Sequence, residues 1–204
     1  MCKLKVISLL TILFLPGLVL SGCRTLLKFR YEMKQPAEET PSGLIRFLEK
    51  NDFPVNSQYV FRDSTAWLKA MRNETIRKNM MSFLIFDHVG RLLENDTNKC
   101  QWAGYDVIQN LNPDSVYRLS TELRLENIQN NIIPMTWAEP LPEFPPDFTV
   151  VITWAKFLGK YNQRLFVLEK AVRENHTARL RLLYLNIDMQ KSWGLVSRQK
   201  ISVN

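Results

Sequence analysis

The segment Phe148-Thr149-Val150-Val151-Ile152-Thr153-Trp154 is an almost continuous apolar run, typical of a strand buried on both faces of a sheet. A second run of this kind covers residues 179–187. The residues between them include 162–174, where apolar side chains recur at helical spacing. A strand, a crossover helix and a strand of these lengths predict a right-handed βαβ unit with parallel strands. We therefore expect an α/β fold with a mixed sheet and this unit at its C-terminal end.

Upstream of this unit, the sequence predicts shorter elements. Residues 81–86 form a strongly apolar strand pattern, followed by turn residues and a return strand at 91–94. A weaker alternation predicts a strand at 57–62, and residues 115–119 fit a strand or an edge segment. Residues 123–133 fit neither the helical nor the strand period. Helices are expected at 42–50, 65–71 and 105–111. The first begins near Ser42, and the second has Ser64 as its N-cap.

The N-terminus has the three-part plan of a secretory signal. A basic start, Met1-Cys2-Lys3-Leu4-Lys5, precedes an apolar run over residues 6–20, and Leu20-Ser21-Gly22-Cys23 follows. The apolar run falls short of the roughly 20 residues that a membrane-spanning helix needs. The Leu-Ser-Gly-Cys ending resembles the lipobox of bacterial lipoproteins.

That resemblance implies that the Cys23 thiol carries a diacylglycerol, that cleavage occurs before Cys23, and that the new amine is then usually acylated. Palmitate is the acyl group we expect. The predicted organisation is a signal peptide at 1–22, a polar, proline-bearing tether at 23–41 and a single α/β domain at 42–204. Arg24 stands where an aspartate would imply retention in the inner membrane. The resemblance therefore places the protein in the bacterial cell envelope, on the outer membrane and facing the periplasm.

Charge and cysteine content narrow the classes of partner and chemistry. The formal net charge is +7, but acidic residues are interleaved with the basic ones, so we expect no nucleic-acid partner. Arg24, Lys28 and Arg30, next to the anchor, favour attraction to anionic lipid headgroups. Of three cysteines, Cys2 leaves with the signal and Cys23 is the lipid site. Cys100 alone remains, so the mature domain has no internal disulfide.

A second resemblance concerns the fold. The segment Thr153-Trp-Ala-Lys-Phe-Leu-Gly-Lys-Tyr161 is similar to the active-site region of thioredoxin-like proteins, which read strand, then Trp-Ala-x-Trp/Phe-Cys-Gly-x-Cys, then helix. The similarity extends through the following helix and strand to Asn186-Ile187-Asp188. The two cysteines of the family fall on Leu158 and Tyr161, and the matching residues are Trp154, Ala155, Phe157 and Gly159.

The sequence departs from the thioredoxin-like family in two ways, which limit what the resemblance implies about activity and fold. Thiol–disulfide chemistry needs a low-pKa thiolate and a second thiol that resolves the mixed disulfide, which Leu158 and Tyr161 do not supply. The family also continues with a cis-proline turn, a hairpin and a helix, whereas residues 189–204 contain no proline. If the resemblance holds, upstream strands such as 81–86 must complete the sheet.

The remaining chemistry-bearing residues form no recognised catalytic or metal-binding motif. We therefore expect a non-catalytic, thioredoxin-like binding or scaffold domain, membrane-anchored through Cys23, with no cofactor and no metal, whose partner is a protein or an envelope component. One alternative is an envelope hydrolase that uses His88 or loop carboxylates. The other is a redox module in which Cys100 acts with a thiol of a partner. The loop carboxylates are Asp87, Glu94, Asp96, Asp106 and Asp114, and the second histidine is His176.

Overall fold

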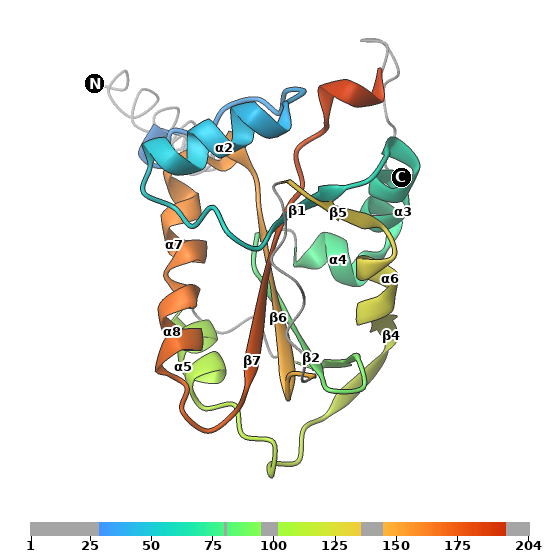
Figure 1. The fold of residues 1–204 in the computed structure, drawn as a ribbon, viewed down its shortest axis with the longest axis vertical. Helices are drawn as coiled ribbons and strands as arrows, with labels where there is room; N and C mark the ends of the chain where they lie inside the picture. Colours follow the sequence, from blue (N-terminus) through green and yellow to red (C-terminus); the bar gives the residue numbers. More distant parts are fainter. Residues whose placement is uncertain (1–28, 80, 95–101, 136–144, 195–204) are drawn as a thin grey trace, which may run out of the picture.

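The computed structural model describes residues 29–79, 81–94, 102–135 and 145–194. Within these residues, seven strands form one mixed sheet in the order β4-β3-β2-β6-β7-β1-β5 (Figure 1). The sheet is strongly twisted, and helices lie on both of its faces. The predicted α/β class with a mixed sheet is confirmed.

The C-terminal βαβ unit lies at the centre of the sheet. β6 (Phe148–Trp154) and β7 (Leu180–Asn186) are parallel neighbours, paired along their whole length. Between them run the 3-10 helix η1 (Lys156–Tyr161) and the helices α7 (Asn162–Phe166) and α8 (Leu168–Glu174). Every residue of β6 is buried, as its apolar sequence predicted. The expected right-handed βαβ unit is therefore confirmed, with its crossover helix divided at Val167.

The other strands extend the sheet on both sides of this unit. β2 (Phe83–Asp87) pairs antiparallel with β6, and β3 (Arg91–Leu93) returns from it, so the predicted hairpin is confirmed. β4 (Leu119–Arg124) lies at the edge beyond β3 and begins where the predicted 115–119 segment ends. β1 (Gln58–Phe61) is parallel to β7, and β5 (Ile132–Pro134) pairs antiparallel with β1.

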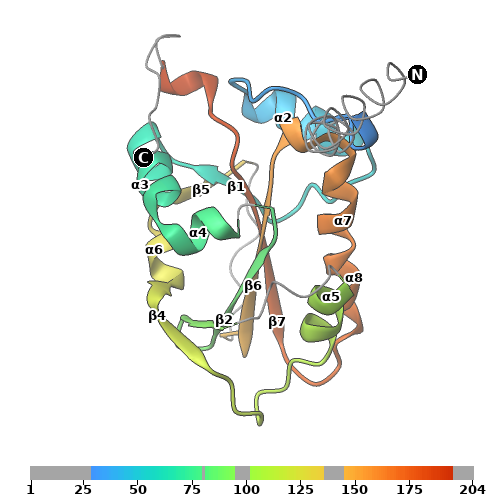
Figure 2. The ribbon, with the colours of Figure 1, turned by 180° about the vertical axis from the view of Figure 1, so that it is seen from behind.

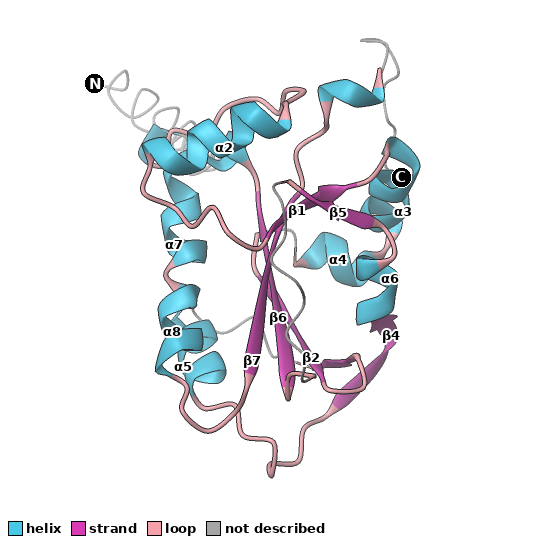
Figure 3. Ribbon diagram, in the orientation of Figure 1, coloured by secondary structure: helices cyan, strands magenta, loops and turns pink. Residues whose placement is uncertain are grey.

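The helices form two groups and one end cap (Figures 2 and 3). α5 (Trp102–Gln109) lies with α7 and α8 on one face. α3 (Ser64–Arg72), α4 (Glu74–Lys78) and α6 (Leu125–Gln129) lie on the other. α2 (Pro41–Lys50) crosses one end of the molecule. The caps of α2 and α3 are Thr40 and Asp63 rather than the serines expected, because their side chains accept the free backbone N–H groups of Gly43 and Ala66.

The core is organised around Trp154, which is fully buried at the end of β6. Its indole N–H donates to the Gln58 side-chain oxygen of β1 at 2.8 Å, so its polar atom is satisfied inside the core. Its ring stacks on Phe47 of α2 with the centroids 6.1 Å apart, and it also packs on Phe166.

No helix within the described residues is long and apolar enough to cross a membrane.

Residues 31–40, here named the N-terminal segment, pack on the domain although they belong to the expected tether. Tyr31 is buried, and Glu39 pairs with Lys156 at 2.6 Å. The segment covers the end of the sheet where β6 and β7 finish, and it is held there by four backbone hydrogen bonds of 2.8 Å. Their donor and acceptor residues are Lys34 to Phe157, Lys160 to Tyr31, Glu39 to Met189 and Lys191 to Glu39.

Candidate functional site

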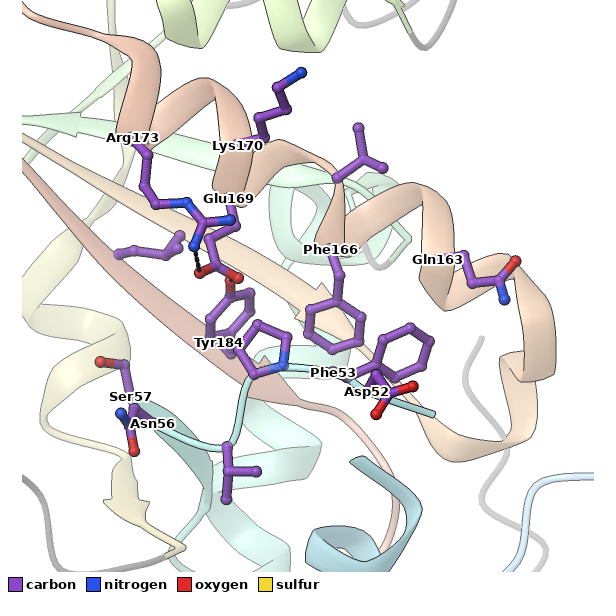
Figure 4. A pocket seen from close by; sticks show the side chains of 14 residues that line it. Asp52, Phe53, Asn56, Ser57, Gln163, Phe166, Glu169, Lys170, Arg173 and Tyr184 are labelled. Carbon is purple, nitrogen blue, oxygen red and sulfur yellow. Dashed lines mark hydrogen bonds and ion pairs between the residues drawn. The ribbon is translucent and has the colours of Figure 1, made fainter. Parts of the chain in front are cut away.

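A groove of about 680 Å³ opens between the chain at 52–57 and the face of α7 and α8 (Figure 4). Its floor is apolar and aromatic, with Phe53, Phe166 and Tyr184 labelled in the figure. Its rim is polar, with Asp52 on one side and Lys170 and Arg173 of α8 on the other. A concave site with an apolar floor and a few polar groups at its edge is the general form of a binding site.

The wall at 52–57 has an unusual backbone. Asp52 and Ser57, at its two ends, have positive φ angles of 54° and 57°, which non-glycine residues rarely adopt. Between them, the Pro54 carbonyl accepts from the Gln58 side-chain amide at 2.6 Å. Phe53 stacks on Phe166 with the centroids 4.4 Å apart. These contacts fix the wall against α7, so the groove is formed by packing that holds a strained turn in place.

A chain of polar contacts crosses the groove from β7 to α8. The Tyr184 hydroxyl donates to Glu169 at 2.8 Å, and Arg173 contacts the other oxygen of the same carboxylate at 3.2 Å. Burial of the Tyr184 ring, together with the charge of Glu169, raises the pKa of this tyrosine far above its usual range. Tyr184 therefore stays protonated as a hydrogen-bond donor, and it positions Glu169 at the groove. Neither residue belongs to a recognised motif in the sequence. Helical spacing alone predicts an ordinary solvent-facing position for Glu169.

The turn that resembles the thioredoxin-like active site lies at the other end of α7 and is covered. Leu158 is 2% exposed, and Tyr161 is half-buried against Tyr31. Gly159 has φ 55° and ψ −130°, and a Cβ at this position would lie 2.4 Å from the Tyr31 carbonyl oxygen. The N-terminal segment therefore lies over Leu158 and Tyr161, the two positions on which the resemblance places cysteines.

Asp188 lies beneath the same covered end. It is 3% exposed and accepts from the Lys156 backbone N–H at 2.6 Å and from the Asn186 side-chain amide at 2.8 Å. Burial raises its pKa to about 6, against these hydrogen bonds, which favour the charged form. With its contacts directed to the backbone of η1, Asp188 positions the turn after β6.

The candidate catalytic residues from the sequence do not converge. His88 is exposed in the turn between β2 and β3, and His176 is exposed between α8 and β7. Beside His88, the Asp87 carboxylate is engaged by Arg91 at 2.7 Å and by the Val89 N–H, which lowers its pKa despite burial. The other carboxylates are dispersed, with Glu94 paired to Arg118, Asp106 exposed on α5 and Asp114 exposed before β4. Cys23, Asp96 and Cys100 lie outside the described residues.

Within the described residues, no group of three His, Cys, Asp or Glu side chains lies close enough to hold a metal ion. A smaller cavity of about 240 Å³ lies on the opposite face of the sheet, between α3, α4 and α6, where Lys69, Asn73 and Asn127 meet an apolar lining. The 52–57 groove is the larger of the two.

No protein-family model, curated protein or solved structure matches this chain.

Proposed function

We propose that this protein is a non-catalytic binding lipoprotein of the bacterial envelope, anchored through Cys23 and facing the periplasm from the outer membrane. Its α/β domain recognises a segment of a protein partner in the 52–57 groove. The observation that carries this proposal is the difference between two sites. The groove is open and has an aromatic floor, whereas the turn that resembles a redox site has Leu158 and Tyr161 in place of thiols and is covered.

We further propose that the α/β domain is thioredoxin-like, and the arrangement of its strands supports this. β6, its crossover helices and β7 are in the order that the resemblance requires, and β2 lies beside β6 in the antiparallel direction. β2 is the upstream strand that the resemblance requires to complete the sheet. Fold similarity alone says nothing about activity, so function is argued from the groove.

The chemistry of the groove favours a protein segment over a small polar metabolite. The aromatic floor fits one apolar side chain, while the cationic groups of Lys170 and Arg173 at the rim fit an acidic residue beside it. Both cations are well exposed, at 65% and 70% of their side-chain surface, and each forms an ion pair within α8, Lys170 with Glu174 and Arg173 with Glu169. Because these pairs are exposed, an acidic residue of a partner can join or replace them without rearrangement of the domain. The hydrolase alternative has less support, because the Asp87 carboxylate beside His88 is bound to Arg91.

Site-specific photo-crosslinking in intact cells tests the binding proposal. A photoreactive amino acid replaces Gln163 in the groove, and a control replaces Lys78 on α4, which is exposed on the other face. We expect one discrete adduct from position 163, none of the same mass from position 78, and loss of the adduct when Arg173→Gln is added. An adduct that forms equally from both positions, or that ignores Arg173→Gln, would overturn the groove as the binding site.

Metabolic labelling with palmitate tests the anchor separately. We expect label on the wild-type chain and none on Cys23→Ala, with the wild type in the membrane fraction. Equal labelling of the two chains would contradict lipid attachment at Cys23, whatever the crosslinking shows.

A further inference from the structure

The short length of chain between Cys23 and the domain determines which end of the domain lies nearest the proposed anchor. Cys23 and Phe29, the first described residue, are separated by a stretch that spans at most about 20 Å when fully extended. From Tyr31 onward, the chain is bound to the domain through Lys160 and Phe157. The surface around Phe29 and η1 therefore stays within this distance of the lipid attachment point. In Figure 1 this is the end where the described chain begins, beside α2 and the start of α7.

This end carries a cluster of basic and aromatic side chains. The guanidinium carbon of Arg164 lies 4.8 Å from the centre of the Tyr31 ring and 5.9 Å from that of Tyr161. Arg30 lies 5.9 Å from the Tyr31 ring, and the two tyrosine rings contact each other edge to face at 5.4 Å. Stacking on the rings holds both guanidinium groups at the surface, where they remain exposed.

The same end has an exposed apolar side chain and little opposing charge. Phe29 is 88% exposed, more than any other large apolar side chain of the described residues except Val116. Lys160 is exposed next to the cluster and pairs with Glu32, the acidic residue that contacts it. The local balance is therefore positive, with Arg30 and Arg164 facing solvent. Basic residues around an exposed aromatic side chain are the composition of surfaces that bind the headgroup region of anionic membranes.

We propose that the face formed by Phe29, Arg30, Tyr31, Lys160, Tyr161 and Arg164, here named the anchor face, lies against the anionic lipid surface that holds Cys23. The inference rests on the proposed anchor and adds an orientation to it. With the anchor face on the membrane, the turn between β2 and β3 at the opposite end of the molecule points into the periplasm (Figure 1). The 52–57 groove lies along the side, between these ends, where a partner reaches it without displacing the membrane.

Hydrogen–deuterium exchange of the lipidated full-length protein in vesicles tests this orientation. Exchange at 29–34 and 156–164 is compared between vesicles of phosphatidylcholine alone and vesicles with added phosphatidylglycerol. Since each basic residue near an anionic surface contributes a factor of about fivefold, we expect at least about fivefold slower exchange at the anchor face with the anionic lipid. Residues 88–92, in the turn between β2 and β3, should exchange equally in both.

A matched pair of variants separates electrostatic contact from simple tethering. Arg30→Gln, Lys160→Gln and Arg164→Gln together should remove the effect of anionic lipid on the anchor face. The control, with Arg72→Gln, Arg77→Gln and Arg118→Gln, removes the same charge from exposed positions elsewhere and should retain it. Circular dichroism of both variants checks that each is folded.

The outcomes distinguish this inference from the anchor on which it rests. Palmitate on Cys23 together with equal exchange in the two kinds of vesicle overturns the orientation and leaves the anchor standing. Protection that is strongest at 88–92, or that survives loss of the three anchor-face charges, also overturns it. A chain that takes no palmitate overturns the anchor, and the orientation with it.

Discussion

The turn at the η1 end of α7 and the groove alongside α7 and α8 differ sharply. At the η1 end, the segment that most resembles a known active site is buried under residues 31–40, and its key positions hold Leu158 and Tyr161. Alongside the helices, residues that match no motif form an open groove with an aromatic floor and charged rim. Likeness to a catalytic motif and availability to a partner are therefore separate properties. The covered end stabilises the fold and fixes the segment that leads towards the proposed anchor, while the groove is open to solvent.

The largest expected effect comes from breaking the covered end at Gly159. Gly159→Ala places a Cβ in a backbone conformation that alanine avoids, and within 2.4 Å of the Tyr31 carbonyl oxygen. We expect a loss of about 3 kcal/mol in the free energy of unfolding, measured by urea denaturation.

Gly194→Ala is the matched control, because Gly194 also has a positive φ, of 60°, but no atom of the described residues lies within 4 Å of its added Cβ. It should cost only about 1 kcal/mol. If the two variants lost the same stability, the contact between Gly159 and the N-terminal segment would contribute nothing.

The second effect is a pH dependence of the unfolding free energy that comes from Asp188 at the covered end. Because burial raises the pKa of Asp188 from 3.8 to about 6, the folded state binds its proton more tightly than the unfolded state does. Stability from this group is therefore fully present below the unfolded pKa and is lost as the pH rises through about 6. Relative to Asp188→Asn, the wild type should lose about 2–3 kcal/mol of unfolding free energy between pH 4 and pH 7.

Denaturation at several pH values measures this difference, with the exposed substitution Asp114→Asn as control. A gap between wild type and Asp188→Asn that is constant over this pH range would show that Asp188 has an ordinary pKa.

The third effect concerns the polar chain that crosses the groove. Tyr184→Phe removes the donor at 2.8 Å from Glu169 and leaves the carboxylate with Arg173. We expect a loss of about 1–2 kcal/mol in unfolding free energy, together with a weaker photo-crosslink from position 163. Tyr59→Phe, on neighbouring β1, is the control, and its cost should stay below about 0.5 kcal/mol. An unchanged crosslink in Tyr184→Phe would mean that the position of Glu169 does not matter for binding.

The smallest effect on stability is expected at the groove rim. Arg173 is 70% exposed, so Arg173→Gln should change the unfolding free energy by no more than about 0.5 kcal/mol, while it abolishes the crosslink from position 163. Arg77→Gln, on α4 of the other face, should change neither quantity. A variant that loses the crosslink only because it has unfolded would be recognised by its denaturation curve.

Much of the fold could be predicted because its signals are local. The apolar runs of β6 and β7 and the helical spacing between them predicted the βαβ unit, and 81–94 predicted the hairpin of β2 and β3. The prediction failed to resolve 123–133, which contains the end of β4, the whole of α6 and the start of β5. These are short elements, and the residues of β5 are stabilised by pairing with β1, a strand far away in the sequence.

The candidate site was much less predictable than the fold. Its lining comes from the 52–57 chain, the crossover helices and β7, and the distances between these segments depend on how the strands pair. No local pattern marked Tyr184 or Glu169, because the contact between them joins a strand to a helix that comes earlier in the chain. Conversely, the one segment that looked like an active site, 153–161, matched by local residue type, and a match of that kind carries no information about what covers it.

By itself, the sequence determined the α/β class, the central βαβ unit and the absence of thiols at positions 158 and 161, since these follow from residue type and short-range periodicity. The tertiary structure decided that residues 31–40 cover that turn and that the 52–57 chain packs beside α7 and α8 so that a groove stays open between them. The physical reason is that covering and opening result from contacts between distant segments. Each such contact must compensate the entropy of ordering its own chain, and that balance is set by the packed domain as a whole.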